Sequence, residues 1–190
     1  YPGGANLSDN INSCQAYISE EEFFRRHPKY KGLYAKVKEA VRQTRGEIMI
    51  YNDEPIDALY HSTCGGQTES SCNVWGKNVS YLSSVQCRYC KQSRHYETIQ
   101  VFSVQDFTTS LGVNNSQPQV KISENTPGGR VKTVKINDKE LSGEKLRRIL
   151  GLPSTWCDFK VNAEQVKIKS RGYGHGLGLC QYGANGMALS

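Results

Sequence analysis

The chain has 190 residues, 37% of them hydrophobic and 22% charged, and its 24 Lys and Arg exceed its 18 Asp and Glu to give a net charge of +6. This length suits one compact body of one or two lobes, and no apolar run approaches the roughly 20 residues that cross a bilayer. The positive charge favours anionic partners. However, the basic residues are dispersed and no basic stripe alternates with aromatic rings, so we expect no nucleic-acid partner.

The first predicted elements are helices. Ser19 is a typical N-cap, and three glutamates at 20–22 follow it, which suits the positive end of a helix and fills the capping-box position. His27-Pro28 then interrupts the segment, because the residue before a proline disfavours helical geometry. Apolar residues recur at helical spacing over 33–41, and Gly46 ends the pattern.

The period then changes from helical to alternating. Residues 47–51 and 56–61 alternate as strands do, and the turn 52–55 between them predicts a β-hairpin. The second strand would carry His61 into a loop formed by residues 62–66.

A short motif occurs twice in the next part of the chain. Residues 103–112 and 142–151 each begin with a serine, continue with apolar residues four apart and end in glycine, which predicts the same short capped helix in both places. Between the copies, residues 120–122 and 131–136 alternate around Pro127-Gly128-Gly129, which indicates a hairpin.

These elements predict an α+β protein with a mixed, β-rich core and short capped helices. Residues 98–160 are interpreted as a small α+β lobe without evident chemistry, and residues 1–97 with 161–190 as the core. The last predicted strand, 165–169, leads directly into a glycine-rich tail.

The tail, residues 170–188, is the most unusual segment. Glycines alternate at 172, 174, 176 and 178, which removes side chains from one face of an extended segment and lets another backbone or a ligand approach. Polar groups of Arg171, His175 and Gln181 then surround bare backbone. A tight turn with a buried His175 explains the same pattern, so the residues alone leave both interpretations open. The glycine order does not fit a phosphate-binding loop.

The tail resembles the R-G-x-G-H-G-x-G-x-x-Q-Y-G-A-x-G-M-A signature of the stage II sporulation protein D (SpoIID) family. Three further blocks recur in the family's order: Cys14-Gln15-Ala16-Tyr17, then His61-Ser62-Thr63-Cys64-Gly65-Gly66-Gln67-Thr68-Glu69, and then Val74-Trp75-Gly76 with Tyr81-Leu82-Ser83-Ser84-Val85. The likeness spans essentially the whole chain and is weakest over 98–160.

The resemblance implies a lytic transglycosylase of sporulation. Such an enzyme cleaves peptide-stripped peptidoglycan glycan strands between N-acetylmuramic acid and N-acetylglucosamine and leaves a 1,6-anhydro product. It implies two lobes with a substrate cleft between them, and a partner amidase that removes the peptides during engulfment. It also implies an extracytoplasmic location, with membrane anchoring through an N-terminal segment. No signal peptide opens the chain at Tyr1, so we expect that segment to lie outside this sequence.

The chemistry requires a carboxylic acid that protonates the leaving oxygen and then accepts the proton of the sugar's own 6-hydroxyl. In the family this acid belongs to a G-E-M-P-like motif before the Cys14 block. We find no such motif here and expect it upstream of Tyr1. Within the chain Glu69 is the one candidate placed near a cleft, but a glutamate on an exposed loop stays ionised and donates protons poorly. The alternative function is a non-catalytic glycan-binding or amidase-enhancer module.

The family blocks also suggest which side chains would line a saccharide groove. Trp75 and Tyr81 would stack on sugar rings, and His61 or His175 would hydrogen-bond to hydroxyl or acetamide groups. A core anchor is the alternative for Trp75, and a structural histidine for His61. The expected groove residues are His61, Ser62, Thr63, Trp75, Tyr81, Tyr173, His175 and Gln181.

The cysteines predict a structural zinc site. Cys87 and Cys90 form a C-x-x-C pair, Cys64 and Cys72 lie close by in sequence, and Cys14 is expected nearby in the fold. The resemblance favours Cys64, Cys87 and Cys90, completed by Cys14 or Cys72. Disulfides remain the alternative. The two other cysteines are interpreted as small buried apolar residues, Cys157 and Cys180.

Overall fold

The structure is a computed structural model that describes residues 17–113 and 117–190. The chain divides into two units, Tyr1–Met49 and Ile50–Ser190, which we describe separately. In the described residues no helix combines the length and the apolar character needed to cross a membrane. The expected Cys14 block lies largely outside the described residues.

The first unit contains helices α1 (Glu20–Arg26), η2 (Pro28–Tyr30) and α2 (Lys31–Gln43). The Ser19 hydroxyl accepts a hydrogen bond from the backbone N–H of Glu22, which confirms the predicted N-cap. α1 ends before Pro28, as the sequence predicts, because proline disfavours helical geometry in the residue that precedes it. The rings of Phe23 and Phe24 both contact Tyr34, so aromatic packing joins α1 to α2.

The second unit begins with a hairpin that is tighter than expected. Strands β1 (Ile50–Tyr51) and β2 (Glu54–Pro55) pair around Asn52 and Asp53, which both have positive φ, as a two-residue hairpin turn requires. The second strand therefore starts at Glu54, and residues 56–61 do not continue the hairpin. His61 lies instead in β3 (Tyr60–His61), which pairs in parallel with β10 (Leu179–Cys180) of the tail.

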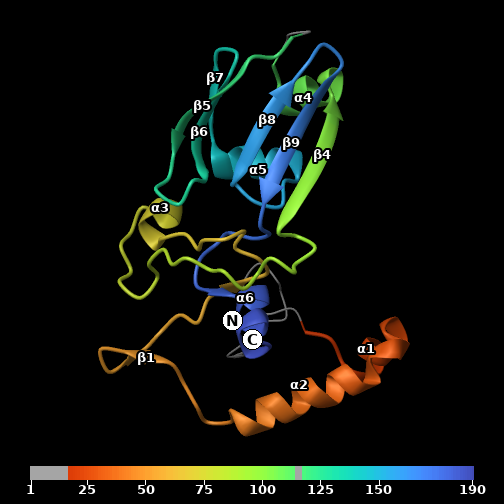
Figure 1. The fold of residues 1–190 in the computed structure, drawn as a ribbon, viewed down its shortest axis with the longest axis vertical. Coiled ribbons are helices and arrows are strands. Elements are labelled where there is room, and N and C mark those ends of the chain that lie inside the picture. Colours follow the sequence, from red (N-terminus) through yellow and green to blue (C-terminus); the bar gives the residue numbers. More distant parts are fainter. Residues whose placement is uncertain (1–16, 114–116) are drawn as a thin grey trace, which may run out of the picture. The chain divides into compact units, whose positions relative to one another are not determined.

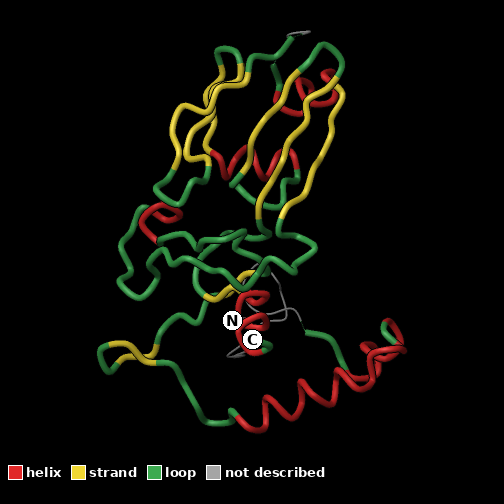
Figure 2. Tube along the Cα trace, in the orientation of Figure 1, coloured by secondary structure: helices red, strands yellow, loops and turns green. Residues whose placement is uncertain are grey.

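Two short helices flank this junction. α3 (Ser71–Trp75) is capped by Ser70 and ends at Gly76, and α6 (Gln181–Ala188) starts directly after β10. Most of the chain between α3 and the next strand is loop, as the tube trace shows (Figure 2).

The rest of the second unit forms two antiparallel three-stranded sheets (Figure 1). One has the order β4 (Glu97–Ser103), β9 (Gln165–Arg171), β8 (Cys157–Val161). The other has the order β5 (Val120–Asn125), β6 (Val131–Ile136), β7 (Lys139–Ser142). The predicted hairpin around residues 127–129 is the β5–β6 pair, so that prediction is confirmed.

The repeated motif forms helices α4 (Val104–Leu111) and α5 (Gly143–Leu150). Ser103 and Ser142 are the N-caps, and Gly112 and Gly151 adopt left-handed geometry at the C-terminal ends, so both copies fold as predicted. Phe107 and Leu146 carry the apolar faces of the helices into one core with side chains from both sheets. The protein is thus a mixed α+β fold, as the sequence predicts.

Candidate functional site

The alternating glycines of the tail have a steric cause. All four have positive φ, between 70° and 113°, so the segment is a series of turns and not the extended strand assumed from the sequence. A Cβ at Gly172 would lie 2.6 Å from the Thr63 carbonyl oxygen, and one at Gly174 would lie 2.9 Å from Cβ of His61. Side chains there would collide with the 59–64 segment, so the glycines permit close backbone packing.

This packing brings two of the sequence blocks together. His61 is buried and its Nδ1 lies 2.9 Å from the Leu177 carbonyl oxygen. The ring of His175 lies 5.8 Å from that of His61, and its Nδ1 accepts a hydrogen bond from the Leu177 N–H. Burial lowers the pKa of both histidines, which favours their neutral forms. Nε2 of His61 is buried without a hydrogen-bond partner in the described structure.

The neighbouring residues of the same blocks are mostly held by backbone contacts. Thr63 pairs with Tyr173 across an isolated bridge, and its hydroxyl lies 2.6 Å from that of Ser93. The Ser62 carbonyl accepts a hydrogen bond from the N–H of residue 182 at the start of α6. Tyr173 is about half exposed, and its ring lies 4.5 Å from that of His95.

Four cysteines converge next to this junction. The sulfur atoms of Cys64, Cys87, Cys90 and Cys180 all lie within 4.8 Å of one another. A zinc ion with Zn–S bonds of ~2.3 Å has sulfur–sulfur edges of about 3.8 Å in a tetrahedron, so four thiolates at these separations fit the ion. Each of the six cysteines in the described residues is a free thiol.

Backbone amides also suit this cluster to a metal. The N–H groups of Gly66 and Gly183 donate to the sulfurs of Cys64 and Cys180, and such donors stabilise thiolate charge. Side-chain hydrogen bonds with Cys64 and Cys90 lower the pKa of Cys180, whereas the hydrogen bond with Cys180 raises the pKa of Cys64. A divalent cation bound by four thiolates would displace their protons, and a closed four-thiolate site leaves no open position for catalysis.

The cluster revises the expected ligand set. Cys64, Cys87 and Cys90 lie in it as expected, and among the described residues the fourth member is Cys180, because β10 pairs with β3 and carries this residue beside Cys64. Cys180 is therefore not merely a small apolar side chain. Cys72 is exposed on α3 outside the cluster, and Cys14 lies outside the described residues. Cys157 belongs to the apolar core, in agreement with its interpretation as a small buried apolar residue.

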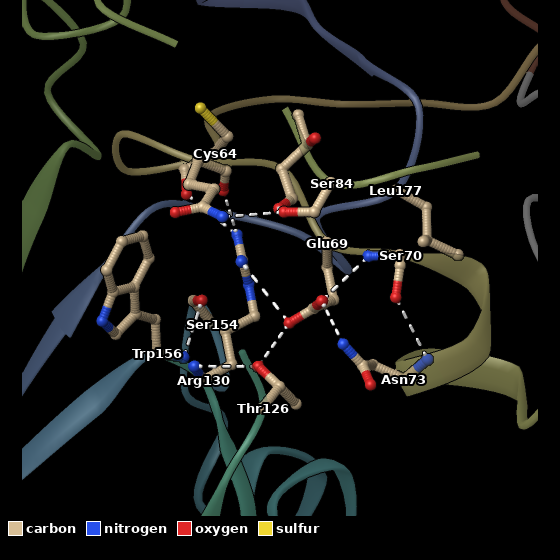
Figure 3. Close-up of polar contacts among 12 residues, drawn as sticks. Cys64, Glu69, Ser70, Asn73, Ser84, Thr126, Arg130, Ser154, Trp156 and Leu177 are labelled. Carbon is tan, nitrogen blue, oxygen red and sulfur yellow. Dashed lines mark hydrogen bonds and ion pairs between the residues drawn. The ribbon is translucent and has the colours of Figure 1, made fainter. Parts of the chain in front are cut away.

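Glu69 differs most from its expected environment. Its side chain is buried and not exposed on a loop, and it lines a cavity of about 230 Å³ together with His175. One carboxylate oxygen accepts hydrogen bonds from the Ser70 N–H at 2.8 Å and the Asn73 amide at 2.7 Å. The other accepts one from the Thr126 hydroxyl at 2.5 Å (Figure 3). Both oxygens of Glu69 thus act as acceptors here.

Arg130 faces the same carboxylate. Its Nη1 lies 3.8 Å from Glu69, and both side chains are almost completely buried, at 3% and 1% exposure. Its Nη2 donates to the carbonyl oxygens of Cys64 at 3.0 Å and Gln67 at 2.8 Å. Burial lowers the pKa of Arg130, and the charge of Glu69 opposes that shift. The guanidinium therefore contacts the backbone of Cys64, which belongs to the cysteine cluster, and faces Glu69 in the cavity wall.

The remaining groove residues lie apart from the cavity lining. Trp75 is 50% exposed on α3, next to Val74, which does line the cavity, so the core interpretation of Trp75 does not fit its exposure. The hydroxyl of Tyr81 accepts a hydrogen bond from the Asp57 N–H. Gln181 is exposed at the first position of α6.

Three contributors to the site were missed in the sequence. Thr126 and Arg130 flank the β5–β6 turn, in the lobe interpreted as having no evident chemistry, and Asn73 lies on α3. The only local signal was an arginine directly after Pro127-Gly128-Gly129. A charged residue next to a turn is ordinarily solvated, so this signal does not predict burial.

Comparison with known proteins relates the chain to sporulation proteins. It is 37% identical over 186 residues to stage II sporulation protein D of Bacillus subtilis, covering 96% of this chain and 54% of the relative. The protein of that name from Bacillus amyloliquefaciens is 36% identical over 190 residues, covering 98% of this chain and 55% of the relative. An amidase enhancer of Bacillus subtilis is 27% identical over 210 residues, covering 81% of this chain and 30% of that protein.

No family model matches the chain. The chain spans about half the length of the two sporulation proteins, and the alignment with each runs across nearly all of this chain. Identity at this level extends well beyond the motif blocks. The chain belongs to the family of stage II sporulation protein D.

Proposed function

We propose that this chain handles peptidoglycan glycan strands as part of a lytic transglycosylase of sporulation, acting on strands whose peptides have been removed. The observation that carries the proposal is the β3–β10 junction, in which the His61 and His175 blocks lie against each other beside a polar cavity. A cavity lined by hydrogen-bonding side chains such as Glu69, Asn73 and His175 is typical of sites for polar ligands, among them saccharides. The relationship to stage II sporulation protein D supports the cellular role.

In the proposed reaction, an acid protonates the oxygen that leaves C1 of N-acetylmuramic acid. The 6-hydroxyl of the same sugar then attacks C1 and gives its proton to the resulting carboxylate. Contacts with Ser70, Asn73 and Thr126 occupy both oxygens of Glu69, which suits a residue that shapes the cavity wall. We therefore propose that Glu69 organises the cavity and that another carboxylic acid supplies the proton.

The test is to incubate the chain and its Glu69→Gln variant with peptide-free glycan strands and to search for 1,6-anhydro ends by mass spectrometry. We expect the chain to bind the glycan in a pull-down assay and to produce no such ends. If the chain produces anhydro ends and Glu69→Gln abolishes them without unfolding the protein, Glu69 is the acid and this assignment fails. If the chain neither binds nor cleaves glycan, the saccharide proposal fails.

We further propose that Cys64, Cys87, Cys90 and Cys180 hold a structural zinc ion. Their separations and the amide donors to sulfur support it. The ion would tie the C-x-x-C loop to the β3–β10 junction and contribute folding free energy without taking part in the reaction. Metal analysis of the purified chain tests this, because less than about half an equivalent of zinc contradicts a four-thiolate site.

A second function has a specific observation in its favour. The chain is related to a protein named amidase enhancer, and a module of that kind needs no catalytic acid. In that case the chain would bind glycan and alter the activity of a separate peptide-removing amidase. Adding the purified chain to such an amidase and following peptide release tests this function, because an enhancer raises the rate and an unchanged rate contradicts it.

We also propose that the chain acts outside the cytoplasm, with glycan strands and a peptide-removing amidase of the engulfment machinery as its partners. The cell-wall substrate is the reason for this location. Protease accessibility of the protein in intact developing cells tests it, since a cytoplasmic protein stays protected.

A further inference from the structure

Arg130 lies where three segments that are distant in sequence meet. Its Nη2 donates to the carbonyl oxygens of Cys64 and Gln67, which lie on either side of the Gly65-Gly66 turn. A Cβ at Gly176 would lie 2.9 Å from the same nitrogen, so the tail backbone packs directly against the guanidinium. One side chain thus spans the loop that bears Cys64 and the tail that bears Cys180.

The same side chain reaches the cavity. Nη1 lies 3.8 Å from the Glu69 carboxylate, and the backbone N–H of Glu69 donates to the Gly176 carbonyl oxygen at 2.8 Å. Thr126 bonds to Glu69 and also to the backbone of Arg130, which closes a small ring of contacts (Figure 3). Arg130 is therefore linked to Glu69 both directly, through the ion pair, and through Thr126.

The orientation of the guanidinium is itself fixed. Arg130 lies with its guanidinium carbon 5.2 Å from the ring of Trp156, and an arginine stacked on an aromatic ring has a defined plane. Nε and Nη1 have no hydrogen-bond acceptor in the described structure. Hence the carbonyl groups of Cys64 and Gln67 are the main hydrogen-bonded targets of this buried cation.

We propose that Arg130 is a positioning residue for the four-cysteine centre and that it couples metal binding to the geometry of the Glu69 cavity. This inference rests on the proposed zinc site. Through Arg130 the backbone of Cys64 is fixed before metal binds, so less ordering is needed on binding. Because linkage is reciprocal, the bound metal must stabilise the Arg130–Glu69 contacts by the same factor.

Residues outside the ligand set that orient the ligands typically change metal affinity by about 10- to 100-fold. We expect Arg130→Met to weaken zinc binding by that factor in competition with a chromophoric chelator. Arg130→Lys should recover part of the loss, because an ammonium group can still donate to one carbonyl. The control is Leu146→Ala, which damages the apolar core without touching the 64–69 loop.

Cobalt supplies a second measurement. Bound to four thiolates, Co²⁺ gives visible absorption bands that depend on a tetrahedral arrangement. We expect Arg130→Met to shift or weaken these bands, and Leu146→Ala to leave them unchanged. A merely destabilised fold would lower thermal stability in both variants without changing the spectrum of the folded protein.

Hydrogen exchange tests the reverse effect, that of the bound metal on the contacts of Arg130. Removing the metal by Cys90→Ser should speed exchange of the amides of Glu69 and Thr126, which lie in the Arg130 contacts, and leave α5 unchanged. The coupling is refuted if Arg130→Met and Arg130→Lys both bind zinc as tightly as the unmodified chain, or if Cys90→Ser leaves these amides unaffected. If the unmodified chain binds no zinc, the metal proposal itself fails; if it binds zinc but the Arg130 variants do too, only the coupling fails.

Discussion

The carbonyl oxygen of Cys64 accepts a hydrogen bond from the guanidinium of Arg130, 66 positions further along the chain. The loop that presents a cysteine to the cluster is thereby attached to the turn of the β5–β6 hairpin. A buried guanidinium that loses such a partner is costly, so this contact constrains both segments. It also connects the sheets of the second unit with the residues of the sporulation family blocks.

The identity of the fourth thiolate is directly testable. Cys180→Ser should reduce the zinc content of the purified chain to a small fraction of one equivalent, because three thiolates and a hydroxyl bind zinc much more weakly. The measurement is elemental analysis after dialysis. Cys72→Ser is the matched control, since Cys72 lies outside the cluster. Loss of zinc in Cys72→Ser with retention in Cys180→Ser would contradict the assigned ligand set.

Gly183 should be required for the cluster although it lies in a helix. A Cβ at this position would lie 2.6 Å from the sulfur of Cys87, so Gly183→Ala should displace that sulfur and lower zinc affinity. In an open helix the same change adds up to about 1 kcal/mol of stability. Gly32→Ala in α2 is the control, because no atom lies within 4 Å of its Cβ. Equal zinc affinity in both variants would show that Cys87 does not bind the metal.

The apolar core should depend strongly on α5. Leu146 is completely buried, whereas Ile149 on the same helix is 37% exposed. We expect Leu146→Ala to lower the free energy of unfolding by about 2–5 kcal/mol, through lost apolar contact and a residual cavity. Ile149→Ala should cost less than about 1 kcal/mol. Urea denaturation measures both, and equal losses would contradict the packing of α5.

Acid should destabilise the protein in part through His175. Burial lowers its pKa below the ordinary 6.5, so the unfolded chain binds the proton more readily than the folded chain. The stability from the neutral ring is present above about pH 6.5 and is lost as the pH falls toward the folded pKa. His175→Asn keeps an acceptor for the Leu177 N–H but cannot titrate. Its free energy of unfolding should therefore fall less steeply over this range, and an unchanged slope would contradict the contribution.

Trp75 should contribute to glycan binding if the saccharide proposal holds. If stacking of the indole on a sugar ring contributes about as much as an aromatic side-chain pair, roughly 0.5–1.5 kcal/mol, Trp75→Ala should weaken binding of peptide-free glycan oligosaccharides by about 2- to 10-fold. Calorimetric titration measures the affinity. Tyr30→Ala, which removes another exposed aromatic side chain outside the family blocks, is the control. Equal affinities for both variants would exclude Trp75 from the binding surface.

Much of the local structure was predictable because its signals are short-range. Ser103 and Ser142 cap their helices and Gly112 and Gly151 end them, through contacts within one turn. The hairpin around Asn52 was predicted, but its second strand was expected to begin at residue 56 and begins at Glu54. The alternating pattern does not reveal that the turn between the strands has only two residues. The burial of Glu69 was missed because its partners, Thr126 and Arg130, lie some sixty residues away.

The sequence by itself determined the α+β class, the capped helices and the likeness to the sporulation family, and it favoured Cys64, Cys87 and Cys90 as one metal site, with disulfides as the alternative. Each of these depends on the helix or strand propensity of neighbouring residues, on cysteines that are close in sequence, or on motifs that occur in a fixed order along the chain. Only the tertiary structure decided that Cys180 completes the cluster. That outcome depends on β3 pairing with β10 across more than half the chain, and nothing in local sequence specifies the partner of a two-residue strand.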